Sequence, residues 1–220
     1  SKTDDLDKAY SQVHSGYDKY LGSVLISGSY NADRTKDDLE ESKDKYKEAL
    51  DALKDAKALK DSEAKEKYDE VVKASDEFLS EVEDTLGLHD DLTGDACSKK
   101  SVSTLDFKKQ STISDQYNTL ISNCLDTLDK LSNAKSKAMS EYFKKTKALY
   151  DEQKSLFAEV QSAYNKKDKV KYLAALSRIK AQSRDFLGLS AKIKDVKSDM
   201  LEDDTDKSIE EMQDYLNSKK

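Results

Sequence analysis

Apolar residues recur along most of this chain at alternating spacings of three and four residues, and this period strongly restricts the fold. Leu6, Tyr10, Val13, Tyr17 and Tyr20 show the pattern near the N-terminus. It is the spacing of an amphipathic helix that packs against partner helices. The chain has no proline and only six glycines, so the residues that most often interrupt helices are nearly absent. The sequence therefore predicts an all-α protein.

Interruptions of the period predict six to seven long amphipathic helices, arranged as one antiparallel bundle or as two hairpin sub-bundles in series. The predicted helices cover residues 3–28, 35–60, 62–86, 112–131, 139–165, 168–200 and 204–218. Thr35 is the expected N-cap of the second helix. Residues 112–165 form either one kinked helix or two, and a phase shift near Asn133 favours two. The layout is similar to spectrin-type repeats only in this general sense, and no family motif is present.

Composition divides the chain into three predicted segments. Residues 1–87 form an acidic three-helix unit, residues 88–110 an irregular connector, and residues 111–220 a basic helical unit with a short acidic C-terminal helix. The segments 75–79 (SDEFL) and 183–187 (SRDFL) are similar. Two unrelated hairpins explain this similarity better than a duplication, because periodic helices often match by chance.

Charge is unevenly distributed along the chain. Residues 1–86 carry 14 Lys and Arg against 23 Asp and Glu, whereas residues 112–200 carry 17 against 11. Solvated helix faces explain most such patterns, but the basic half is also a candidate surface for an anionic partner, either membrane headgroups or a wall polymer. Nucleic acid is not expected, because the pI is near 5.1 and no base-reading motif is present. The candidate residues are Lys144, Lys145, Lys147, Lys166, Lys167, Lys169, Lys171, Arg178, Lys180 and Arg184.

The two cysteines, Cys97 and Cys124, are either a disulfide or two separate buried thiols. They form no CxxC motif and no cysteine–histidine cluster that would hold zinc. Cys97 lies in the predicted connector and Cys124 on a predicted helix, so a disulfide would fasten the connector to the bundle. The disulfide is the favoured prediction, and it in turn favours an extracytoplasmic location.

Motifs for catalysis or cofactor binding are absent from the sequence. There is no GxSxG, HExxH, GxGxxG or Walker-type loop, so we expect neither an enzyme nor a cofactor. His89, Asp91 and Asp95 are a weak candidate metal site, but the EF-hand pattern fails at the following positions and an ordinary acidic loop is favoured. Tyrosines on the apolar stripes predict packing in preference to a sugar or peptide groove.

The longest apolar stretch, at residues 20–27, is far shorter than the roughly 20 residues of a membrane-spanning helix. The polar start at Ser1 is typical of a chain whose signal or anchor has been removed. We therefore expect a non-enzymatic, extracytoplasmic interaction or spacer module, secreted or membrane-anchored, that binds a protein or an anionic envelope surface. The alternatives are a cytosolic coiled-coil scaffold with reduced cysteines, and a small-molecule or metal-binding enzyme at residues 88–110.

Overall fold

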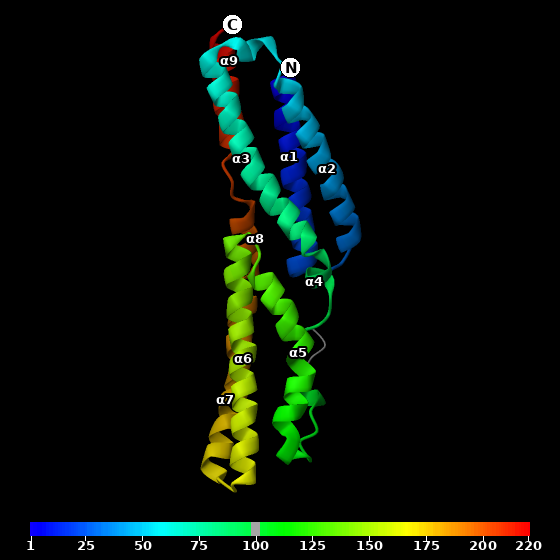
Figure 1. Ribbon diagram of the computed structural model, residues 1–220, viewed down its shortest axis with the longest axis vertical. Helices are drawn as coiled ribbons and strands as arrows, with labels where there is room; N and C mark the ends of the chain where they lie inside the picture. The colour runs from blue at the N-terminus through cyan, green and yellow to red at the C-terminus, as the bar shows by residue number, and fades with distance from the viewer. Residues whose placement is uncertain (98–101) are drawn as a thin grey trace. The chain divides into compact units, whose positions relative to one another are not determined.

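The computed structural model describes residues 1–97 and 102–220, and in this part of the chain it contains helices and no strands (Figure 1). Of these described residues 84% are helical, which confirms the predicted all-α fold. The helices are α1 (Lys2–Leu21), α2 (Ala32–Leu53), α3 (Ser62–Gly87), α4 (His89–Thr93), α5 (Ile113–Ser132), α6 (Lys137–Asn165), α7 (Lys169–Ser190), α8 (Ile193–Leu201) and α9 (Thr205–Ser218). A π-helical turn (Gly22–Ile26) follows α1, and 3-10 turns lie at Lys57–Lys60, Val102–Thr104 and Gln110–Thr112.

The chain forms two compact units. Unit 1 contains residues 1–89 and 197–220, and unit 2 contains residues 90–196. The sequence grouped the C-terminal helix with the basic segment, but α9 packs against α3 and α1, where Ile209 and Met212 are fully buried. With α9 included, the sequence of unit 1 has a net charge of −13 and that of unit 2 has +6. The units are therefore more unequal in charge than the predicted segments.

Unit 1 is built from α1, α2, α3 and α9, with a core that contains many tyrosines. Tyr17, Tyr20 and Tyr46 are completely buried, as predicted for residues on the apolar stripes. Their hydroxyls do not reach the rim but find partners inside the unit, such as Thr85 Oγ1, which lies 2.9 Å from the Tyr17 hydroxyl. Buried polar groups of this kind remain stable because each has a hydrogen-bond partner.

Two helix boundaries differ from the prediction. Thr35 is not an N-cap, because α2 already begins at Ala32, after Asn31 has adopted a left-handed conformation with φ +54°. The helix predicted over residues 168–200 is broken between α7 and α8, just after Gly188, a poor helix former. In contrast, residues 112–165 form two helices as favoured, and the Ser136 hydroxyl caps α6 by accepting a hydrogen bond from Met139 N at 3.2 Å.

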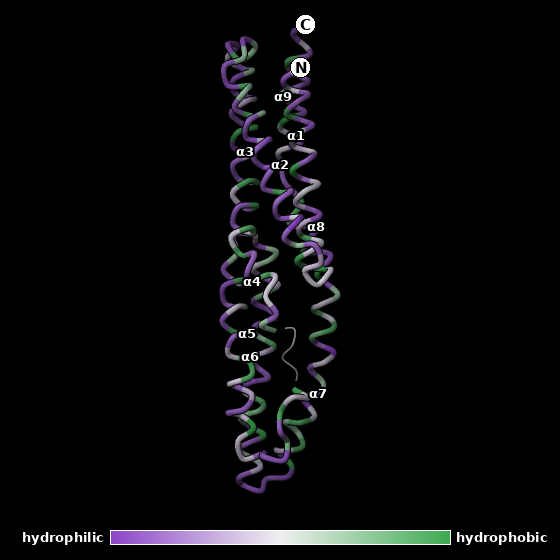
Figure 2. The backbone as a smooth tube through the Cα atoms, turned by 90° about the vertical axis from the view of Figure 1, so that its right-hand side faces the viewer, coloured by the Kyte–Doolittle hydropathy of each residue, from purple (hydrophilic) through white to green (hydrophobic). Residues whose placement is uncertain are grey.

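Unit 2 has a smaller core, in which α6 packs against both α5 and α7. Its centre combines Ile113, Tyr117, Phe157 and Val160 with Ala175 from α7. Of the residues of α7, only Ala175 and Gln182 are buried. The predicted apolar stripe of this helix is therefore partly exposed. Figure 2 shows hydrophobic and hydrophilic residues mixed along the helices of both units.

Candidate functional site

The turn that joins α6 to α7 carries the densest group of predicted basic residues. The chain reverses there because Lys167 adopts a left-handed conformation with φ +59°. Asp168 N then donates to Ala163 O at 2.9 Å, and Lys167 N donates to Tyr164 O at 3.1 Å, which together satisfy the end of α6. The Asp168 side chain caps α7 by accepting from Lys171 N at 3.1 Å. The turn is thus a well-defined helical hairpin.

A groove of about 700 Å³ lies between α6 and α7 next to this turn, and we call it the basic groove. Small side chains leave the space open, while Lys166, Lys171 and Arg178 supply positive charge. Neither Lys166 nor Lys171 forms an ion pair with another residue that the structure describes. The groove is lined by Leu156, Ala158, Glu159, Ser162, Ala163, Lys166, Asp168, Lys171, Ala174, Ala175 and Arg178.

The ten predicted basic residues do not form one surface. Lys166, Lys167, Lys169 and Lys171 lie together at the turn, whereas Lys144 and its neighbour Lys145 lie roughly 30 Å away along α6, at 1.5 Å per residue. Arg184 and Lys180 are exposed further along α7.

Two of the predicted cations are partly neutralised within the chain. Arg178 donates to Glu152 at 2.8 Å and to Asp185 at 3.1 Å, and these contacts raise the pKa of its guanidinium. Lys147 lies 3.8 Å from Asp151 and also approaches Asp129. The lysines of the turn, in contrast, are exposed and form no ion pair with another described residue.

Three further residues join the turn at the same end of unit 2, and charge analysis of the sequence missed them. Phe107, Lys108 and Lys109 precede α5 and are exposed. Figure 1 shows the start of α5 beside the α6–α7 turn within unit 2. Two hydrogen bonds hold this arrangement: the Tyr172 hydroxyl donates to Gln110 Oε1, and Ser114 N donates to Gln161 Oε1 at 2.9 Å.

Exposed apolar side chains accompany these lysines. Val170 is 80% exposed, Leu173 49% and Tyr164 48%. In the sequence Val170 lies between Lys169 and Lys171, and this position was the signal for it. We call the whole group the tip of unit 2, formed by Phe107, Lys108, Lys109, Tyr164, Lys166, Lys167, Lys169, Val170, Lys171 and Leu173.

Cys97 and Cys124 form a disulfide, as predicted, with their Cα atoms 4.7 Å apart. Cys124 is fully buried on α5, in the same core cluster as Leu128 and Phe157. The bond therefore attaches the segment that precedes α5 to the core of unit 2.

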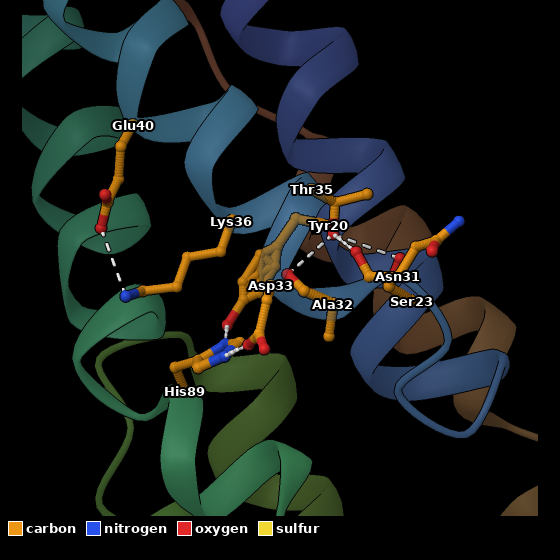
Figure 3. Close-up of polar contacts among 9 residues, drawn as sticks. All are labelled: Tyr20, Ser23, Asn31, Ala32, Asp33, Thr35, Lys36, Glu40 and His89. Atoms are coloured by element: carbon orange, nitrogen blue, oxygen red, sulfur yellow. Dashed lines mark hydrogen bonds and ion pairs between the residues drawn. The ribbon is translucent and has the colours of Figure 1, made fainter.

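The candidate metal residues have other contacts. His89 is buried at the start of α4, and Figure 3 shows its ring between Tyr20 and Asp33. Its Nδ1 lies 2.7 Å from the Tyr20 hydroxyl and its Nε2 lies 2.8 Å from Asp33 Oδ1. A carboxylate only accepts, so Nε2 carries a proton and donates to Asp33. Asp91 lies 4.0 Å from Lys130 Nζ.

This arrangement makes His89 a structural link between α1 and the start of α2. Over residues 1–97 and 102–220, no group of three or more His, Cys, Asp or Glu side chains is placed to hold a metal ion. The candidate set of His89, Asp91 and Asp95 is therefore not assembled as a metal centre in the described part of the chain.

A second groove, of about 680 Å³, lies in unit 1 between α1 and the segment before α9. The Tyr10 hydroxyl donates to Asp203 Oδ2 at 2.5 Å, and His14 Nε2 lies 2.8 Å from Leu201 O. The pKa of the Tyr10 hydroxyl is raised, mainly because the group is buried and to a lesser extent because of its hydrogen bond to Asp203. These contacts attach the C-terminal segment to α1, and the surrounding carboxylates would repel an anionic ligand.

Comparison of the chain with protein-family models, with curated proteins and with solved structures finds no match. None of the helices in the described part of the chain combines the length and the apolar content needed to cross a membrane. The function therefore has to be argued from the chemistry of the two units.

Proposed function

We propose that this protein is a non-enzymatic, extracytoplasmic interaction or spacer module, tethered at or near a cell envelope, which binds an anionic partner through unit 2. The observation that carries the proposal is the basic groove with the lysines of the adjoining turn. Lys166 and Lys171 have no ion-pair partner among the described residues, so an anion can bind them without displacing a carboxylate. Arg178 is already paired and contributes less.

The charge difference between the units supports binding by unit 2 in particular. Unit 1 carries −13 and repels an anionic partner, whereas unit 2 carries +6. An acidic unit joined to a basic one also keeps the protein soluble while restricting the anionic partner to one region. This supports a module that presents its binding surface on one of its two units.

The disulfide supports the extracytoplasmic part of the proposal. Structural disulfides persist in oxidising compartments and are rare in reducing ones. Cys97 and Cys124 are paired in unit 2 and no free cysteine is present in the described part of the chain. Intact cells can be treated with an alkylating reagent before lysis and the mass of the protein then measured. We expect the mass of the disulfide-bonded chain, with no alkyl group added to either cysteine. Recovery of two alkylated thiols would favour the cytosolic scaffold instead.

Binding of the purified, oxidised protein to two anionic probes tests the interaction itself. The probes are soluble polyphosphate and vesicles that contain phosphatidylglycerol, each at low and high salt. We expect binding to at least one probe at low salt and its loss at high salt, because charge pairs are screened. The variant K166Q/K171Q should bind about tenfold or more weakly, at about 1 kcal/mol per lysine.

The matched control is K144Q/K145Q, which removes the same charge from exposed positions on the same helix pair. It should retain most of the binding. Failure to bind either probe at low salt, or equal losses in the two variants, would contradict the proposal.

A further inference from the structure

We propose that the tip of unit 2 docks on the surface of an anionic lipid bilayer, with Val170 entering the headgroup region and the surrounding lysines contacting lipid phosphates. This inference rests on the proposed function and names the class of its anionic partner. It does not need a membrane-spanning helix, because the contact is peripheral.

Exposed apolar side chains are concentrated at the tip. Seven large apolar residues are strongly exposed in the described part of the chain, and four of them lie here. Val170 is 80% exposed, and Phe107, Tyr164 and Leu173 are 40 to 49% exposed. Exposed apolar groups that cluster in this way mark interaction sites, whereas isolated ones do not.

Positive charge surrounds the exposed apolar side chains of the tip. Six lysines belong to the tip, and two acidic side chains at this end, those of Asp168 and Asp106, are engaged with the backbone. Asp168 Oδ1 accepts from Lys171 N at 3.1 Å, and Asp106 Oδ1 accepts from Lys108 N at 3.0 Å. The carboxylates therefore shape the two turns, while the ammonium groups of Lys167 and Lys169 extend into solvent.

The combination favours lipid over the other anionic or apolar partners. A soluble polyanion offers charge but nothing for Val170 and Leu173 to contact. A second copy of this chain that met the tip with its own tip would bring two groups of lysines together, which is unfavourable. An anionic bilayer satisfies both features, because aliphatic side chains enter the boundary of the acyl region, aromatic rings lie at headgroup level and lysines extend toward phosphates.

The backbone of the tip also suits insertion. The turn is closed by the hydrogen bonds from Lys167 N and Asp168 N to the end of α6, and α7 starts with a capped N-terminus. The backbone N–H groups of Lys167, Asp168 and Lys171 are therefore already paired when the side chains meet the lipid. Binding needs little further ordering, so more of the interaction energy contributes to affinity.

A co-sedimentation experiment with the full, oxidised chain separates the apolar and charged contributions. The vesicles contain phosphatidylcholine with phosphatidylglycerol, or phosphatidylcholine alone. We expect binding to the mixed vesicles only. V170S/L173S should reduce the partition coefficient about tenfold without a change in charge, from the lost burial of two aliphatic groups. K167Q/K169Q should reduce it by a similar or larger factor.

Each variant has a matched control elsewhere on the same helices. L187S removes a 72% exposed leucine of α7 outside the tip, and K144Q/K145Q removes two exposed lysines of α6. Both controls should partition like the unchanged protein. All of these positions are exposed, so thermal melts should show that the variants remain folded.

Fluorescence gives a direct measure of insertion, because the chain contains no tryptophan. In V170W the single indole should shift to shorter wavelength and become protected from a soluble quencher when mixed vesicles are added. In L187W, the control, the spectrum should not change. Binding without any shift in V170W would overturn the insertion of Val170.

The outcomes distinguish the failure of this inference from failure of the proposed function. Binding to polyphosphate but not to mixed vesicles would overturn the lipid assignment and leave an anionic partner in place. Vesicle binding that is equal in V170S/L173S and the unchanged protein would also overturn it, because charge alone would then be sufficient. Binding to neither probe would contradict both proposals.

Discussion

Residues 75–79 and 183–187 have similar sequences, SDEFL and SRDFL, but they lie in different environments. In unit 1, Ser75, Phe78 and Leu79 are buried on α3. In unit 2, the corresponding Leu187 is 72% exposed on α7. The same apolar spacing therefore fills a core in one unit and remains partly at the surface in the other. The number of helices around each segment explains the difference.

Aromatic contacts show the same contrast. The Phe78 ring has its centroid 5.7 Å from that of Tyr10 and 5.9 Å from that of Tyr17, in edge-to-face arrangements. Phe186 is half-buried and packs against Tyr150, at 4.9 Å between centroids. Unit 1 thus uses its helices to enclose a core, whereas unit 2 leaves one helix available for contact with a partner.

The largest expected effect comes from truncating these two phenylalanines. Phe78→Ala should lower the free energy of unfolding of unit 1 by about 3 to 5 kcal/mol, because it leaves a cavity among buried rings. Phe186→Ala should cost unit 2 less than about 2 kcal/mol, since the site is already open to solvent. Hydrogen exchange in α3 and α7 measures the two effects separately. Equal losses would remove the distinction between the units.

Reduction of the disulfide should destabilise unit 2 alone. A closed loop with a sequence separation of 27 residues is worth about 3.5 kcal/mol in the chain-entropy model. Unit 1 contains no cysteine, so amide exchange in α1 and α3 should be unchanged by dithiothreitol while exchange in α5 accelerates. Equal acceleration in both units would mean that they unfold as one.

The paired serines give a smaller effect. Ser75 Oγ donates to Val71 O and also meets the buried Tyr46 hydroxyl. Ser75→Ala should therefore cost about 1 to 3 kcal/mol, because the Tyr46 hydroxyl loses its partner. Ser183 is exposed, so Ser183→Ala should change the stability of unit 2 by less than about 0.5 kcal/mol. Urea unfolding of both variants tests this, and a costly Ser183→Ala would contradict it.

The smallest effect concerns the acidic surface of unit 1. Lys47 donates to Glu83 at 2.6 Å, and with Lys43 it lowers the pKa of the Glu83 carboxyl below its usual value near 4.5. A lowered pKa stabilises the folded state above the unfolded pKa, and the contribution is lost as the pH falls through the folded pKa. Because the pair is exposed, Glu83→Gln should cost less than about 1 kcal/mol at neutral pH.

The same variant should make no difference to stability at pH values below the folded pKa of Glu83, where the carboxyl is protonated in both states. Thermal melts at neutral and acid pH give the comparison. Lys54 lies at the C-terminal end of α2, the helix that carries Lys47, and it is exposed. Lys54→Gln therefore serves as a control that should change stability little at either pH. A loss in Glu83→Gln that persists in acid would contradict the ion-pair explanation.

Much of the fold follows from local chemistry that the sequence displays. The apolar period predicts most of the helices. The turn between α6 and α7 also lies where the predicted helices 139–165 and 168–200 meet. The pairing of Cys97 with Cys124 could also be predicted, because these are the only two cysteines and one of them lies in the connector. Thr35 was misassigned because Asn31 reverses the chain earlier through an unusual φ angle.

The tertiary structure alone decided which apolar faces are covered. The period of a helix identifies its apolar side, but not how many neighbouring helices cover that side. The sequence therefore predicted a packed apolar side for both α7 and α3. Packing assigned α9 to the acidic unit and brought the 3-10 turn Gln110–Thr112, which directly follows Lys109, against α6. The sequence determined the helices and the lysines, whereas contacts between distant segments decided which of those lysines lie near the exposed Val170.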